Sequence, residues 1–151
     1  MLKHSLMSLA APLFLAFTLF APALQAADAE ALITHRQGVY KVVSGHMDGI
    51  KSILFLGHAN KDELTYHSEG ILNALKTLSG DFAPGSDQGK TRAKAEIWSK
   101  PEEFKEAGSN AWQAATSFDE LAKMGEKGEQ IEAFKKLGGT CKGCHEKFRK
   151  D

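Results

Sequence analysis

The sequence has very little cysteine. Only two cysteines occur in 151 residues, and they stand within five consecutive positions, so no structural disulfide is available. It also lacks a second cysteine pair and any pair of histidines at zinc-ligand spacing. The formal net charge is zero, with 19 basic and 19 acidic side chains, which gives no indication of nucleic acid binding. The fold must therefore be held by side-chain packing and by whatever the two cysteines carry.

The two cysteines belong to the motif Cys141-Lys142-Gly143-Cys144-His145, the C-x-x-C-H attachment signature of c-type haem. Each thiol can add to one vinyl group of the same porphyrin, and the adjacent imidazole can ligate the iron. A redox dithiol, half of a zinc site and a strained disulfide are the alternatives for a bare C-x-x-C pair. A dithiol requires a βαβ context that is absent here, and a zinc site requires two further ligands. The motif therefore predicts one covalently bound haem c per chain, whereas a non-haem dithiol or metal protein would be colourless.

The first 26 residues are typical of a secretory signal peptide. Lys3 and His4 form a short basic head, an apolar run follows from Leu6 to Phe20, and small residues come next. The run is too short for a transmembrane anchor. We expect cleavage after Ala26, although cleavage after Ala23 would give a cleaner A-x-A pattern. The mature protein would then be periplasmic, cover residues 27–151 and have no membrane anchor.

Helical periodicity dominates residues 27–151, and no strand pattern or internal repeat competes with it. The first helix is predicted to end near Gly57, and a second is predicted over residues 61–78. One stripe of the first helix contains Leu32, Arg36, Val39, Tyr40, Val43, Met47, Ile50 and Leu54. Arg36 lies within this apolar stripe, so it either reaches out from the core edge or pairs with a buried anion such as a haem propionate.

The second half of the sequence predicts two more helices after a long loop. Glycines and prolines interrupt residues 80–98. Helix restarts with Ser99 as cap, Pro101 in the first turn and Glu102 completing a capping box, with Trp112 among its inward-facing residues. After Gly125 and Gly128, a last helix carries the haem motif. These elements predict an all-α, antiparallel four-helix bundle with the haem attached near the C-terminus.

These features together resemble the cytochrome c′ family. The resemblance rests on the C-terminal C-x-x-C-H motif, the four-helix pattern, Arg36-Gln37 in the first helix, the segment 95–99 before the third helix, and Arg149 four residues after His145. It covers essentially the whole of residues 27–151. By this resemblance, Cys141 and Cys144 form the thioethers and His145 is the axial ligand.

The resemblance also implies roles for residues around the haem. Arg36 and Gln37 would contact the haem edge, Arg149 would lie on the proximal face, and the loop around Arg92 would approach the propionates. The position four residues after the arginine faces the distal side of the iron in this family, and it is Tyr40 here. Spacing independently predicts that Arg149 stacks beside His145, because the two are four apart on a helix.

The sixth coordination position of the iron lacks an evident ligand. Only six residues follow His145, and none is Met or His. Met47 is seven residues beyond Tyr40, roughly 10 Å along the helix axis. His35 and His46 point some 120–140° away from Tyr40, at about 100° per residue, and we expect both, with His58 and His67, to be exposed to solvent. Tyr40 itself is a neutral phenol at its ordinary pKa near 10.

The expected site is therefore a five-coordinate haem whose open face lies in a pocket partly filled by Tyr40. Such a pocket favours small uncharged ligands, nitric oxide and carbon monoxide. The resemblance adds electron transfer with an unidentified redox partner, capture of nitric oxide, and homodimers formed through the first two helices. A haem peroxidase, or another haem enzyme, is the alternative, but it requires a distal acid or base that no histidine supplies.

Overall fold

The computed structural model describes residues 21–58, 62–78 and 80–151. Most of the expected signal peptide, residues 1–20, lies outside this range. The first helix of the structure begins at Ala21 and continues through the expected cleavage position after Ala26. Within the described residues, no helix combines the length and apolar character needed to cross a membrane.

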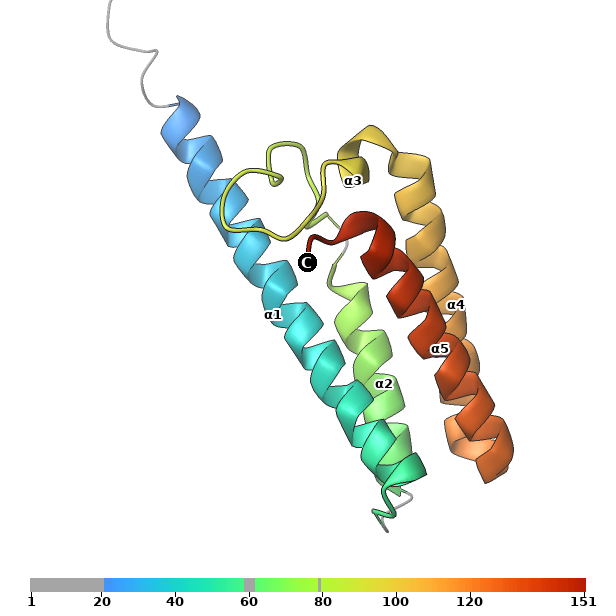
Figure 1. Cartoon of the computed structure of the whole chain (residues 1–151). Coiled ribbons are helices and arrows are strands. Elements are labelled where there is room, and N and C mark those ends of the chain that lie inside the picture. Colours follow the sequence, from blue (N-terminus) through green and yellow to red (C-terminus); the bar gives the residue numbers. More distant parts are fainter. Residues whose placement is uncertain (1–20, 59–61, 79) are drawn as a thin grey trace, which may run out of the picture.

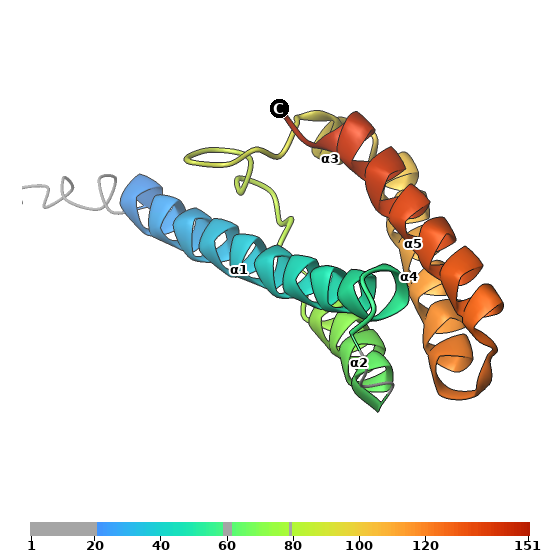
Figure 2. The same ribbon diagram turned by 60° about the horizontal axis from the view of Figure 1, so that its bottom comes forward.

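Four long helices form the bundle, which confirms the predicted fold class. They are α1 (Ala21–Phe55), α2 (Asp62–Lys76), α4 (Pro101–Met124) and α5 (Lys127–Phe148), and a single helical turn, α3 (Glu96–Ser99), precedes α4. Helix α1 packs along α2, and α5 packs along α4 (Figures 1 and 2). The long loop between α2 and α3 crosses the end of the bundle where the chain terminates (Figure 1). The described residues contain no strand, only one isolated bridge between Ala93 and Arg149.

The hydrophobic core joins the two helix pairs over only part of their length. Contact between α2 and α4 is extensive, whereas α1 and α5 meet sparsely. Phe118 on α4 has no exposed surface and lies at the centre of the cluster. Buried partners come from all four long helices: Val43, Ile50, Ile53, Leu54, Leu64, Ile71, Ala114, Ala115, Ala122 and Leu137. Burial of this apolar surface is the main stabilising contribution. Because α1 and α5 meet sparsely, the end of α5 that carries the cysteines has no tightly packed neighbour on the α1 side.

Two local predictions for α4 are wrong. Ser99 does not cap this helix, because it is the last residue of α3, and Lys100 stands at the N-cap without a side-chain capping hydrogen bond. A capping box occurs instead at the start of α5, between Glu126 and Glu129. Trp112 was expected to face inward, but it is 38% exposed, and the Lys76 ammonium lies 6.0 Å from its ring centre. Pro101 does occupy the first turn, as predicted.

One buried polar bridge links α2 to α4. The Ser68 hydroxyl donates to the Asp119 carboxylate at 2.7 Å, and both residues are buried. Lys123, one turn further along α4, pairs with the same carboxylate at 2.9 Å. The buried charge is therefore compensated on both sides, as its burial requires.

The contact between α1 and α2 contains two interlocked histidines, which were expected to be exposed. The Nδ1 atoms of His46 and His67 lie 3.0 Å apart, and both residues are half-buried. Each ring lies against a glycine of the opposite helix, His46 against Gly70 and His67 against Gly49. Burial, and secondarily the neighbouring His67, lower the pKa of His46. The glycines are needed here because any side chain would meet an imidazole.

Gly70→Ala is expected to destabilise the protein by about 1–3 kcal/mol, because the added methyl group would overlap the His46 ring. Gly45→Ala is the matched control, since nothing lies within 4 Å of a Cβ at that position of α1. There the substitution should stabilise the helix by about 0.5–1 kcal/mol. Chemical unfolding measures both values, and equal effects of the two substitutions would contradict this packing.

Candidate functional site

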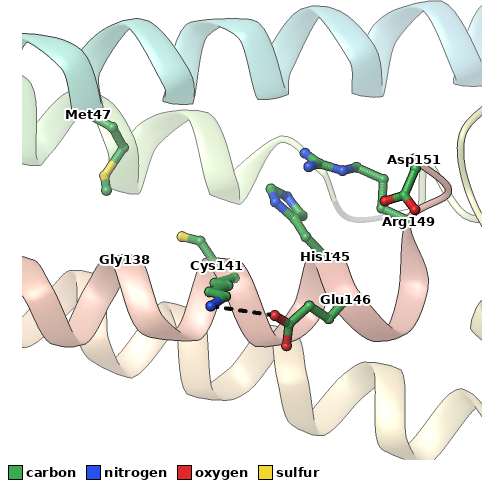
Figure 3. A pocket seen from close by; sticks show the side chains of 8 residues that line it. Met47, Gly138, Cys141, His145, Glu146, Arg149 and Asp151 are labelled. Carbon is green, nitrogen blue, oxygen red and sulfur yellow. Dashed lines mark ion pairs between the residues drawn. The ribbon is translucent and has the colours of Figure 1, made fainter.

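The three residues of the haem motif occupy adjacent turns near the end of α5. Cys141, Cys144 and His145 are all half-buried. Beside them is a hollow of about 450 Å³, lined by Met47, Gly138, Cys141, Lys142, His145, Glu146, Arg149 and Asp151. The imidazole of His145 is directed away from α5 into the space in front of α1 (Figure 3). The helix thus presents the imidazole and a thiol to one hollow.

The chemical state of these groups suits ligation of a metal by nitrogen. Burial, together with the positive charges of Arg149 and Arg92, lowers the pKa of His145. The imidazole is therefore neutral at pH 7 and keeps a lone pair for iron. Burial raises the pKa of both cysteine thiols, so they are protonated thiols in the free chain.

The two arginines that act on His145 belong to the chain terminus and to the long loop. Arg149 is the C-cap of α5, and its guanidinium lies beside the His145 ring (Figure 3). Its backbone N–H still donates to the His145 carbonyl oxygen at 3.0 Å, so the predicted spacing of four holds just beyond the helix. Arg92 belongs to the loop, and its Nε donates to the Lys150 carbonyl oxygen at 3.0 Å.

Backbone hydrogen bonds fasten the loop to the end of α5. The Lys94 N–H donates to the Phe148 carbonyl oxygen at 2.9 Å, and the Lys150 N–H donates to the Arg92 carbonyl oxygen at 2.7 Å. They flank the isolated bridge between Ala93 and Arg149. The loop therefore holds the segment that follows His145.

Arg36 fastens the same loop to α1. Its Nη1 donates to the Asp81 carbonyl oxygen at 2.8 Å and to the Ser86 hydroxyl at 2.9 Å. Its Nη2 donates to the Ser86 carbonyl oxygen at 2.6 Å and to the Thr91 hydroxyl at 2.8 Å. The residue is only 3% exposed. The guanidinium thus neither reaches out from the core edge nor pairs with an anion here, because it is buried and its acceptors are neutral loop oxygens.

Aromatic rings complete the surroundings of this guanidinium. The Arg36 Cζ lies 4.9 Å from the ring centre of Phe82 and 5.9 Å from that of Trp98. The Trp98 indole N–H donates to the Phe82 carbonyl oxygen at 3.0 Å. Burial lowers the pKa of Arg36, while the negative charge of Asp81 opposes this shift. Asp81, Ser86 and Thr91 were missed in the sequence because a loop has no periodicity that marks its buried polar residues.

Gln37 and His35 add outer contacts to the same loop. Gln37 Nε2 donates to the Lys90 carbonyl oxygen at 2.8 Å in an exposed position. His35 is exposed to solvent, as expected, and its Nδ1 lies 2.7 Å from the buried Asp81 carboxylate. Both Arg36 and Gln37 thus direct polar groups at the loop, and their contact with a haem edge stays a prediction.

Tyr40 lies one turn along α1 from Arg36, near the haem motif. Burial raises the pKa of Tyr40 to about 12. The second cause is the negative charge that Cys144 would carry as a thiolate. The electrostatic coupling of Tyr40 with both Cys144 and Cys141 shows that it lies near them. With 39% of its surface exposed, it is not a core residue. Its phenol is neutral at pH 7.

Met47 also contributes to the wall of the hollow. Its side chain descends from α1 above the Gly138–Cys141 part of α5, and His145 lies further along (Figure 3). The helical stripe predicted that Met47 faces inward. The seven residues between Tyr40 and Met47 predicted that the two side chains lie at different levels along α1, and Met47 indeed lies away from His145 (Figure 3).

These residues fit a covalently attached haem. Two thiols three positions apart, an adjacent neutral imidazole and a hollow beside them are the donor set and the space that a c-type haem requires. The described residues contain no group of three or more His, Cys, Asp or Glu side chains arranged to hold a metal ion. A covalently bound haem is therefore better supported than a metal ion held directly by the cysteine thiols and the imidazole.

Comparison with known proteins agrees with this fit. The family model described as cytochrome c′ matches residues 31–149. A cytochrome c′ of Pararhodospirillum photometricum is 35% identical over 124 residues, which cover 82% of this chain and 99% of that protein. The crystal structure of cytochrome c′ from Thermochromatium tepidum superposes with a TM-score of 0.77 at 29% identity, covering 82% of this chain and 97% of the other. A nitric oxide complex of a variant cytochrome c prime from Alcaligenes xylosoxidans has a TM-score of 0.75 at 22% identity, covering 82% and 97%.

Arg36→Lys is expected to lower the free energy of unfolding by about 2–4 kcal/mol, because one ammonium cannot replace the two-armed guanidinium at four acceptors. Amide exchange should accelerate at Lys94 and Lys150, whose N–H groups join the loop to α5. Hydrogen exchange and chemical unfolding measure the two effects.

The control for this prediction is Gln37→Ala, which removes a single exposed hydrogen bond to the loop. It should change the unfolding free energy by less than about 1 kcal/mol. Unchanged exchange at Lys94 and Lys150 in Arg36→Lys would mean that Arg36 does not hold the loop on the end of α5.

Proposed function

Because the chain belongs to the cytochrome c′ family, we propose that it is a periplasmic c-type cytochrome with His145 as the axial ligand of its iron. The cofactor is haem c, bound covalently through cysteine, as in this family. Cys141 and Cys144 are the proposed thioether residues. The observation that carries the proposal is the half-buried Cys141, Cys144 and His145 beside one hollow at the end of α5.

The haem supplies an iron that changes oxidation state and can bind a small ligand. The chain holds one side of it with the neutral His145, whose orientation is supported by Arg149 and by the loop that carries Arg92. Positive charge from these two arginines near the imidazole favours the reduced iron electrostatically. A readily reduced iron supports the proposed electron transfer with a redox partner. We also propose that Arg92 and its loop contact the haem propionates.

The opposite side of the haem is proposed to be open and lined by Tyr40. The phenol is neutral because its pKa is near 12, so a phenolate ligand is disfavoured at pH 7. We propose nitric oxide and carbon monoxide as the ligands, and the nitric oxide complex of the Alcaligenes relative supports the first of them. The peroxidase alternative has no supporting observation, since the relatives are named as cytochromes and His145 is the only histidine among the described residues lining the hollow.

The proposal includes export and self-association. The signal peptide of residues 1–26 would deliver a haem domain of residues 27–151 to the periplasm. A homodimer through α1 and α2 is supported by large apolar side chains on these helices, since Val42 is 52% exposed and Tyr66 is 67% exposed. Nucleic acid is not expected as a partner, given the zero formal net charge.

The ferric protein is expected to be high-spin and to lack the near-infrared sulfur-to-iron band, because Met47 is the only methionine among the described residues lining the hollow and it lies away from His145. Met47→Leu should leave the optical spectrum unchanged, since Met47 lies above Gly138–Cys141 instead (Figure 3). A sulfur-to-iron band that disappears in Met47→Leu would identify Met47 as a ligand and overturn the proposed open side.

Tyr40→Ala is expected to raise the association rate of carbon monoxide with the ferrous protein about tenfold, the change that follows from a barrier lower by about 1.4 kcal/mol. Tyr40→Phe keeps the ring and should leave the rate close to that of the unchanged protein. Flash photolysis or stopped-flow mixing provides the rates. If Tyr40→Ala binds carbon monoxide no faster, the side chain does not limit access to the iron.

A further inference from the structure

The half-buried contact of His46 and His67 has no role in the proposed haem site. The two rings come from different helices, α1 and α2, with centres 5.3 Å apart and planes inclined by 68°. Their Nδ1 atoms face each other at 3.0 Å. The Tyr66 ring stands edge-on beside both, at 5.6 Å from His46 and 5.2 Å from His67. The haem motif, in contrast, lies on α5.

The two imidazoles are held in this arrangement by the helices themselves. Each ring rests against the glycine of the opposite helix, Gly70 for His46 and Gly49 for His67. The rings therefore have little freedom to separate while α1 and α2 remain packed. A ligand pair that is already assembled loses less conformational entropy when it binds an ion.

The separation of the nitrogens matches that of two neighbouring ligands on one metal ion. Imidazole nitrogens bind such ions at about 2.0–2.1 Å, which puts them about 2.9 Å apart at a right angle and about 3.3 Å apart at a tetrahedral angle. The observed 3.0 Å is close to the right-angled value. Right-angled nitrogen ligation is typical of the square-planar or tetragonal geometry of Cu(II) and Ni(II).

We infer that His46 and His67 form a two-imidazole binding site for a divalent copper or nickel ion on the α1–α2 face. In the metal-free pair the two Nδ1 atoms point at each other in a hydrogen bond. To bind the ion, the donating ring would carry its proton on Nε2 instead, and both rings would turn so that their Nδ1 lone pairs converge on the ion. The pair is half-buried in the single chain. Tyr66, which stands beside both rings, also belongs to the face proposed for the homodimer, so the inference requires that this face stay open to solvent around the pair. The described residues include no cluster of three or more ligating side chains, so water would complete the coordination.

Titration of the haem-loaded protein with Cu(II), Ni(II) and Zn(II), followed by calorimetry, tests the site. We expect one Cu(II) ion per chain, bound more tightly than Ni(II) or Zn(II). Either His46→Asn or His67→Asn should weaken Cu(II) binding at least about tenfold, since each removes one of two protein ligands. His58→Asn is the matched control, because His58 pairs with Glu63 at 2.8 Å outside the cluster and should leave the affinity unchanged.

The electron paramagnetic resonance spectrum of bound Cu(II) gives a second readout in the unchanged protein. Coupling of copper to two nitrogens is expected, and it should fall to one nitrogen in His67→Asn. The inference is overturned if both single variants bind Cu(II) as tightly as the unchanged protein, or if His58→Asn weakens binding as much as they do. Absence of two-nitrogen coupling in the unchanged protein would overturn it without any substitution, and none of these outcomes depends on the haem site.

Discussion

The hydrogen bonds from the buried guanidinium of Arg36 to the long loop hold together the part of the molecule that helix packing leaves apart. The core joins α2 to α4, while α1 and α5 touch only sparsely. Arg36 ties α1 to the loop through four hydrogen bonds, and the loop ties itself to the residues around Arg149. Helix α1 and the end of α5 are thus linked through an irregular segment.

This indirect link explains how the hollow beside the haem motif can exist in a small bundle. Direct packing of α1 on the end of α5 would fill the space beside His145 with side chains. Because the loop carries the connection instead, Met47 and the haem motif can line a hollow of about 450 Å³, and Tyr40 lies near Cys144. The proposed haem would occupy this space and become part of the packing between α1 and α5.

Helix periodicity and the haem motif were sufficient to predict the fold class, the approximate helix ends and the place of Arg36 on the apolar stripe of the first helix. They could not identify what Arg36 contacts, because its acceptors, such as Ser86, belong to a loop without periodicity. The pairing of His46 with His67 was also missed. Angles on an isolated helix show which side a residue occupies, but a glycine on a second helix, here Gly70, decides whether a ring can be buried there.

We propose that His145 is the only protein ligand of the iron and that the opposite side of the haem is open. Resonance Raman spectroscopy of the ferrous protein at neutral pH tests it most directly, because it reports both the coordination number and the iron–imidazole bond. We expect a five-coordinate high-spin pattern with an iron–histidine stretching band that disappears in His145→Ala. A six-coordinate low-spin pattern without added ligand would contradict it.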